Sequence, residues 1–298
     1  MKHTHLGSTE TESQGFGGMW IFVVLFILSA ALIKSAEAQS RNVDGTFLVD
    51  ARINGALAVL LIDTGAEHSL LDRGFAQQLG LHPVDVANIQ RLNSAGQTEV
   101  VLVTDLDIQS AHANSIEMMT DDLSASSGAL GVHIDGVLGD DMLRDFAATL
   151  DYSAGSVTFG PISALHRSVP IKLHNIGKRY FVDLSSDGIS LTFLLDTGTN
   201  FSVLSSSGWS KLNQSKEALL TIDGVRSSGA SATSKLVCIH QMRVGSASYE
   251  NLPMRVESSA SAGVLANLEV SGLLGSDFLR RFVVSLDLAN ESEANILH

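Results

Sequence analysis

The chain has a single cysteine, only four prolines and no excess of positive charge. With Cys238 alone, no internal disulfide can form, and its place in the apolar run KLVCIHQM is typical of a buried strand. A net charge of −13 without any run of Lys or Arg argues against a nucleic-acid partner, which requires a basic face. Few prolines beside 26 glycines suit a protein built from short strands and tight hairpins.

Several catalytic motifs are also missing. The histidines are scattered, without H-E-x-x-H or paired metal-ligand spacing, so we expect no metal and no cofactor. There is no G-x-S-x-G nucleophile elbow and no G-x-x-x-x-G-K-[ST] phosphate loop. The common signatures of metalloproteases, α/β-hydrolases and P-loop enzymes are therefore excluded.

The N-terminal segment, residues 1–38, stands apart from the rest of the chain. Residues 20–33 are uncharged and mostly apolar, and a small-x-small pattern, Ala36-Glu37-Ala38, follows them. This run is shorter than the ~20 residues of a membrane-spanning helix, which favours a cleaved signal peptide. Adding residues 17–19 lengthens it, and the leading segment is poorly basic, so an uncleaved membrane anchor at residues 17–33 remains the alternative. Both interpretations place the globular part outside the cytoplasm, periplasmic or secreted.

The most informative feature is an internal duplication. LLIDTGAEHSLL, which contains Asp63, matches FLLDTGTNFSVL, which contains Asp196, at an offset of 133 residues. Further along, GVLGDDMLRDFAATLD from Gly136 matches GLLGSDFLRRFVVSLD from Gly272, with nine of sixteen positions identical. We therefore predict two similar lobes, residues 39–160 and 161–298, each carrying one copy of an Asp-Thr-Gly loop.

Each half begins with the same local pattern. Apolar runs flank Asn54-Gly55 in the first half and Asp187-Gly188 in the second, which predicts tight hairpins because both turn positions need positive φ. Each Asp-Thr-Gly then ends a strand and begins a loop. Short helices are expected after N-caps at Asp72 and Ser205, and again after Asp140 and Ser276. Further hairpins are expected around Gly96 and Gly229.

On these residues the chain resembles the retropepsin-like aspartic proteases. The shared pattern is an apolar strand into D-T-G-[A/S/T], a glycine-tipped hairpin, and a later pair of apolar residues before glycine, here Val137-Leu138-Gly139 and Leu273-Leu274-Gly275. The resemblance implies an all-β fold with a few short helices, in which two closed β lobes form a pseudo-twofold, pepsin-like arrangement on one chain. It also implies an extended peptide or unfolded protein as substrate, and a monomer, because both halves of the site lie on one chain.

The resemblance assigns roles to the residues of the two loops. Asp63 and Asp196 are the expected catalytic pair, Gly96 and Gly229 are flap candidates, and the remaining loop residues are expected to support the site: Thr64, Gly65, Ala66, Thr197, Gly198 and Thr199. In this family two adjacent carboxyls share one proton, so that one activates water while the other protonates the scissile carbonyl. We expect Asp196 to be the more readily ionised member, because the Thr199 hydroxyl could donate to it while Ala66 has none to offer.

Two alternatives from other functional classes remain at this point. The first is a catalytically inactive peptide-binding module of the same fold, since two intact triplets do not show turnover. The second is an actin-like sugar kinase or ATPase, whose phosphate loop reads D-x-G-T, as Asp196-Thr197-Gly198-Thr199 does locally. The chain lacks the long helices and the second glycine-rich loop of such enzymes.

Overall fold

The computed structural model describes residues 39–90, 95–162, 168–176, 179–212, 220–225, 231–257, 270–287 and 293–297. All of them belong to one compact unit, Ala38–His298. The apolar N-terminal run falls outside the described residues, so a signal peptide or anchor stays a prediction. Within the described part of the chain, no helix is both long and apolar enough to cross a membrane.

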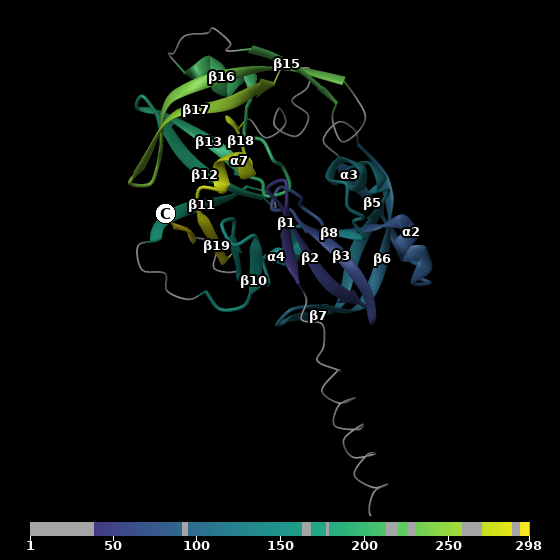
Figure 1. Cartoon of the computed structure of the whole chain (residues 1–298). Coiled ribbons are helices and arrows are strands. Elements are labelled where there is room, and N and C mark those ends of the chain that lie inside the picture. The colour runs from purple at the N-terminus through teal and green to yellow at the C-terminus, as the bar shows by residue number, and fades with distance from the viewer. Residues whose placement is uncertain are drawn as a thin grey trace, which may run out of the picture. The chain divides into compact units, whose positions relative to one another are not determined.

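The first half of the chain forms an eight-stranded sheet (Figure 1). Its strand order is β1-β2-β3-β8-β4-β7-β6-β5, and an added β2–β6 pairing folds the sheet back on itself. The β3–β8 and β4–β7 pairs are parallel. The strands are β1 (Ser40–Val43), β2 (Thr46–Ile53), β3 (Ala56–Ile62), β4 (Leu70–Asp72), β5 (Pro83–Gln90), β6 (Ala95–Ile108), β7 (Ala111–Asp121) and β8 (Gly136–Leu138).

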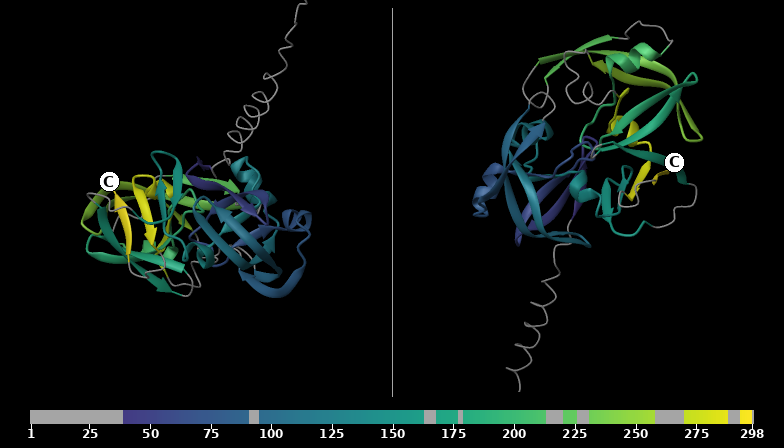
Figure 2. Two further views of the ribbon diagram at one scale, coloured as in Figure 1. Left: turned by 90° about the horizontal axis from the view of Figure 1, so that it is seen from below. Right: turned by 180° about the vertical axis from the view of Figure 1, so that it is seen from behind.

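The second half repeats this topology strand for strand. Its order is β11-β12-β13-β18-β14-β17-β16-β15, again with an added pairing, here β12–β16. The strands are β11 (Ser168–Ile176), β12 (Arg179–Ser186), β13 (Ile189–Leu195), β14 (Val203–Leu204), β15 (Leu220–Val225), β16 (Ser231–Val244), β17 (Ala247–Glu257) and β18 (Gly272–Leu274). The expected two-lobed, mainly β fold is confirmed, and both views of Figure 2 show the two sets of strands as separate lobes.

Four further strands join the lobes. β9 (Ala148–Asp151) from the first half pairs with β19 (Val283–Asp287) from the second, while β10 (Ser156–Phe159) pairs with β9 and β20 (Glu293–Leu297) pairs with β19. They extend the second sheet to twelve strands in the order β10-β9-β19-β20-β11. The hydroxyls of Thr149 and Ser285, at equivalent places in the two halves, lie 3.1 Å apart across this junction. The two sequence halves are therefore held together by shared backbone pairing.

Turn chemistry accounts for the hairpins that open each lobe. Asn54 and Gly55 have φ values of 50° and 82°, and Asp187 and Gly188 have 50° and 79°. Positive φ at both central positions is the type I′ geometry that matches strand twist, so this prediction is confirmed. Asp44-Gly45, between β1 and β2, adopts the same geometry with φ values of 50° and 87°.

The helices are short, and two of the four predicted N-caps are confirmed. Asp72 caps α2 (Arg73–Gln78) by accepting from the amides of Gly74 and Phe75, and Ser205 caps α5 (Ser206–Lys211) by accepting from Gly208. The prediction that Asp140 and Ser276 are N-caps is wrong. They are the first residues of α4 (Asp140–Leu143) and α7 (Ser276–Leu279), and the preceding glycines occupy the cap position without a side-chain bond.

The apolar core is continuous between the halves. Alternate residues of β2 are fully or nearly fully buried, and so are those of β12. They belong to one cluster that draws on both lobes: Phe47, Val49, Ala51 and Ile53 from β2, with Tyr180, Val182 and Leu184 from β12. Burying one such large side chain contributes about 1.5–3 kcal/mol. This core holds the strands β3 and β13, whose ends carry the two Asp-Thr-Gly loops.

Candidate active site

The two acidic loops meet at the boundary between the lobes. Asp63 directly follows β3, and its amide donates to the Leu138 carbonyl of β8 at 3.0 Å. Asp196 follows β13 and makes the same bond with Leu274 of β18 at 3.1 Å. Both aspartates are half-buried, and their carboxyls share a hydrogen bond. The duplicated halves therefore bring the predicted pair into direct contact, and neither aspartate is fully buried.

Glycine is required in each loop because the opposite carboxyl occupies the space of a side chain. A Cβ built on Gly65 would lie 2.7 Å from Cγ of Asp196, and one on Gly198 would lie 2.3 Å from Cγ of Asp63. The same glycines orient the acids. The Gly65 amide donates to Asp63 Oδ1 at 2.8 Å, and the Gly198 amide donates to Asp196 Oδ1 at 3.0 Å. Each glycine thus holds its own aspartate and leaves room for the other.

Two fully buried threonines lock the loops to one another. The Thr64 hydroxyl donates to the Leu195 carbonyl at 2.8 Å and accepts from the Thr197 amide at 3.1 Å. The Thr197 hydroxyl does the same in reverse, donating to the Ile62 carbonyl at 2.9 Å and accepting from the Thr64 amide at 3.2 Å. These four bonds cross between the lobes and fix the spacing of the two acids.

A second pair of residues, which the sequence analysis missed, supports each loop from behind. The Ser69 hydroxyl donates to Asp141 at 2.6 Å and accepts from the Gly139 amide at 3.0 Å. In the other lobe Ser202 repeats both bonds, at 2.6 Å to Asp277 and at 3.0 Å from Gly275. The signal was present, because serine and aspartate recur at these positions in both halves.

Comparison with known proteins agrees with this geometry. A family model described as gag-polyprotein putative aspartyl protease matches residues 49–145, and one described as aspartyl protease matches residues 182–278. The chain belongs to the retropepsin-like aspartic proteases. Among solved structures, the crystal structure of aspartic proteinase from Irpex lacteus is similar, with a TM-score of 0.57 and 12% identity over 87% of this chain and 96% of that chain. No curated protein sequence matches the chain.

Membership of this protease family and the two-lobed β fold remove the actin-like kinase as an interpretation. The short segment Asp196–Thr199 matches its phosphate loop only locally. In the structure this segment packs against Asp63 rather than against a second glycine-rich loop.

Burial raises the pKa of both carboxyls in this aspartic protease pair, but unequally. For Asp63, burial raises the pKa, while the amides of Gly65 and Ala66 and the charge of Arg179 act in the opposite direction. For Asp196, burial and then the negative charge of Asp63 raise the pKa well above 3.8. The two carboxyls therefore share one proton at intermediate pH, and the larger rise at Asp196 favours Asp63 as the ionised member.

This assignment reverses the expectation based on Thr199. The Thr199 backbone amide donates to Asp196 as the Ala66 amide donates to Asp63, so the loops are equal in this respect. No bond from the Thr199 hydroxyl to the carboxyl is found among the described contacts. The hydroxyl bond on which the prediction that Asp196 ionises first depends is therefore missing from the described contacts, and the order of ionisation stays a prediction.

The flap candidates are only partly described. Gly96 lies within β6, paired with Ile89 of β5, so it is not the tip of its hairpin as expected. Residues 91–94, which connect β5 to β6, and Gly229 lie outside the described residues. The two hairpins are present as β5–β6 and β15–β16. Contact of either glycine with a substrate stays a prediction.

The Tyr152 hydroxyl is a buried polar group near the pair. It has no hydrogen-bond partner among the described residues, and its ring packs edge-on against Phe47 with centroids 4.6 Å apart. Burial, with a further contribution from the charge of Asp196, raises the Tyr152 pKa. The hydroxyl is therefore neutral across the accessible pH range.

Tyr152→Phe is expected to stabilise the protein. It keeps the ring contact and removes an unsatisfied hydroxyl, whose burial costs about 1–3 kcal/mol. In a protein of this size each kcal/mol raises Tm by about 2–4 °C, which calorimetry resolves. Tyr152→Leu, which also removes the ring, should lower Tm. A lower Tm for the phenylalanine variant would show that the hydroxyl has a bonding partner in solution.

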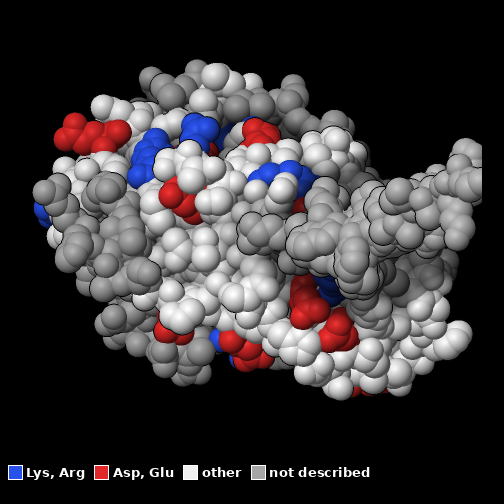
Figure 3. All heavy atoms as spheres, turned by 60° about the horizontal axis from the view of Figure 1, so that its bottom comes forward, with Lys and Arg blue, Asp and Glu red and all other residues white. Residues whose placement is uncertain are grey.

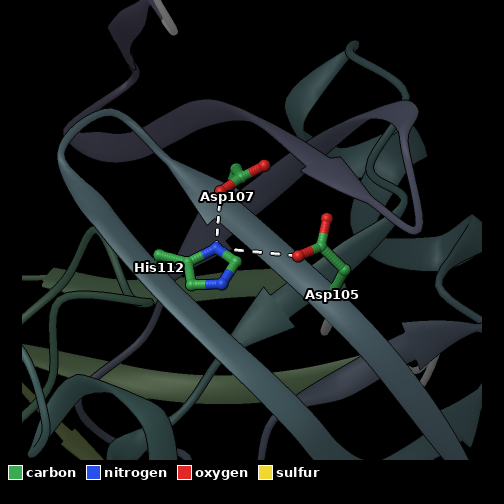
Figure 4. Close-up of side chains that lie close together, drawn as sticks. All are labelled: Asp105, Asp107 and His112. Carbon is green, nitrogen blue, oxygen red and sulfur yellow. Dashed lines mark hydrogen bonds and ion pairs between the residues drawn. The ribbon is translucent and has the colours of Figure 1, made fainter.

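One group of metal-ligating side chains lies close together in the described part of the chain, away from the pair. Asp105, Asp107 and His112 sit on the exposed surface of β6 and β7, with His112 Nδ1 2.7 Å from Asp107 and 3.6 Å from Asp105 (Figure 4). Asp107 faces His112 in the strand register. The hydrogen bond to Asp107 raises the pKa of His112. These contacts account for the group as a surface ion pair.

Charge elsewhere on the surface is dispersed. On the face shown in Figure 3, the described acidic and basic side chains are interspersed within a larger uncharged area. The described residues on that face form no continuous basic patch. The absence of a nucleic-acid partner stays a prediction from the net charge.

Proposed function

We propose that the chain is an active aspartic endopeptidase that hydrolyses peptide bonds with a water held between Asp63 and Asp196. The single observation that carries this proposal is the hydrogen-bonded pair of half-buried carboxyls, locked together by reciprocal threonine bonds across the lobes. A binding module would not need two acids placed in contact at the energetic cost of burial. The protease fold supports a peptide substrate, and we propose that it binds in an extended conformation.

Each carboxyl takes a distinct part in the proposed reaction. Ionised Asp63 removes a proton from the water as its oxygen attacks the scissile carbonyl carbon, and protonated Asp196 donates its proton to the carbonyl oxygen. In the second step Asp63 returns a proton to the amide nitrogen, the C–N bond breaks, and Asp196 recovers its proton from the collapsing diol. The amides of Gly65 and Gly198 hold both carboxyls in place throughout.

We also propose where and in what form the enzyme acts. Both aspartates come from one chain, which supports a monomer as the active species. Residues 1–37 precede the compact unit. The apolar run and the small-x-small pattern of the N-terminal segment support an extracytoplasmic location, with release by cleavage or retention by an anchor at residues 17–33.

Turnover and its pH dependence test the proposal. The purified chain should cleave a denatured protein substrate, and pepstatin should block cleavage. The rate should follow a bell-shaped pH profile, limited on the acid side by protonation of Asp63 and on the alkaline side by loss of the proton from Asp196. Because burial raises both pKa values, the optimum should lie above 3.8. Saturable binding of the substrate without any cleavage would identify the inactive module instead.

A further inference from the structure

One contact between the lobes breaks their symmetry. Arg179, the first residue of β12, is 7% exposed and reaches across to the loop of Asp63. Its Nε donates to the Gly65 carbonyl at 3.0 Å, and its Nη1 donates to Glu67 at 2.7 Å. A buried guanidinium of the second lobe is therefore fastened to the backbone of the first catalytic loop, two residues from Asp63.

The equivalent contact on the other side carries no positive charge. The residue 133 positions before Arg179 is Thr46, which is also buried at the start of its strand, β2. The counterpart of Glu67 is Asn200, whose side-chain amide donates to Asp44 at 2.8 Å. The threonine, glycine and serine contacts are matched between the loops. The charge beside the loops is not matched.

We propose that Arg179 is a positioning residue that decides which of the two aspartates is ionised, by holding the negative charge on Asp63 and so leaving the proton on Asp196. The inference rests on the proposed peptidase function and adds an assignment of roles to it. Without a positive charge beside only one of them, two nearly identical loops would hold the proton on either carboxyl. Only a fraction of the molecules would then have Asp63 ionised and Asp196 protonated, the state that the proposed reaction requires.

Glu67 does not cancel the effect of the guanidinium. The Arg179 side chain is 9% exposed while that of Glu67 is 33% exposed, so water screens the carboxylate more than the cation. The Nε edge of the guanidinium faces Gly65, whereas Glu67 binds at Nη1. Within this ion pair, the guanidinium is therefore the group in contact with the backbone of the catalytic loop.

Other titratable groups also lie around the two loops, among them buried Asp140, whose amide donates to the Ala66 carbonyl and whose carboxylate pairs with Arg144. Asp196 faces Asp63 directly, and Tyr152, close enough to sense the charge of Asp196, stays neutral. His68, next to Glu67 in the chain, has its Nδ1 3.5 Å from Asp141. The charge of Arg179 acts on Asp63, whereas the largest influences on Asp196 are burial, Asp63 and two backbone amides.

Two substitutions that break the same ion pair should have opposite effects on the pH–rate profile. Arg179→Met removes the cation, so the acid limb should move to higher pH and kcat/KM on that limb should fall about three- to tenfold, since one unit is a factor of ten. Glu67→Gln removes the compensating anion and leaves the cation, so the acid limb should move to lower pH. A contact that merely clamps the lobes would give shifts of the same sign in both variants, or none.

Three controls separate charge from structure. Arg179→Lys keeps the charge without the two-pronged geometry and should keep the acid limb near its original position. Asn200→Ala breaks the neutral contact on the opposite side and should leave the limb unchanged. Thermal unfolding of each variant reports any loss of lobe packing, and if Arg179→Met fails to fold, the downward shift in Glu67→Gln carries the test alone.

The outcome can be told apart from failure of the proposed function. No turnover by the unaltered chain would refute the peptidase, whereas turnover with an acid limb that moves in neither variant would refute the role of Arg179. NMR titration of the two aspartate carboxyl carbons in the same proteins gives a readout that needs no turnover. It should show Asp63 ionising first in the unaltered chain and the preference weakened in Arg179→Met; equal titration in both would overturn the assignment.

Discussion

Asp196→Asn is expected to abolish hydrolysis and, at neutral pH, to make the fold more stable. The asparagine cannot donate a proton to the scissile carbonyl, so the rate should fall by about 10³-fold or more. The stability effect follows from the raised pKa of Asp196. Between 3.8 and that raised pKa the folded chain binds more protons than the unfolded chain, so the stability of the native protein falls as pH rises. A neutral amide does not incur this loss.

The pH dependence makes the stability claim specific. Tm of Asp196→Asn should exceed that of the unaltered chain at pH 7, and the difference should shrink as pH falls below 3.8, where the carboxyl is protonated in both the folded and the unfolded state. Asp63→Asn should lose activity to the same extent but gain less stability, because Gly65, Ala66 and Arg179 already favour its charged form. Asp145→Asn, at an exposed acid, serves as the control with unchanged activity and Tm. Substantial turnover by Asp196→Asn or Asp63→Asn would refute the mechanism in which both carboxyls take part.

Much of the architecture could be predicted because it depends on local interactions whose sequence signals occur in both halves of the chain. Asn54-Gly55 and Asp187-Gly188 specify their turns through positive φ, and Asp72 specifies a helix start through its own side chain. The contact between Asp63 and Asp196 followed from the duplication, since two like lobes related by an approximate twofold place equivalent loops together.

The missed features depend on contacts between residues far apart in the chain. Glycine is required at position 139 because a Cβ there would lie 2.6 Å from the His68 backbone. No local sequence signal reveals this contact. The N-cap was therefore predicted at Asp140, one residue after the observed cap at Gly139. The pairing of β9 with β19 joins segments more than a hundred residues apart. Arg179 lies well before the second acidic triplet, and it acts on the first loop only once the lobes have docked.

Thr197→Val should weaken the junction between the lobes more than any other conservative change considered above. Valine has the shape of threonine, so the packing stays, but the Ile62 carbonyl and the Thr64 amide each lose a partner in a fully buried place. An unsatisfied buried group costs about 1–3 kcal/mol, so the loss should be about 2–5 kcal/mol of unfolding free energy. Activity should also fall by about tenfold or more, because small displacements of the acids misplace the water.

A set of matched variants shows whether the reciprocal hydrogen bonds are the cause. Thr197→Ser keeps the hydroxyl and should retain most of the stability, while Thr158→Val, at an exposed position of β10, should change it by less than about 0.5 kcal/mol. Thr64→Val should match Thr197→Val, because the two make equivalent bonds. The cost of the double variant should differ from the sum of the two, since neighbouring residues in one hydrogen-bond network are energetically coupled. A denaturant midpoint of Thr197→Val equal to that of Thr158→Val would show that the lobes are held by their shared strands and core alone.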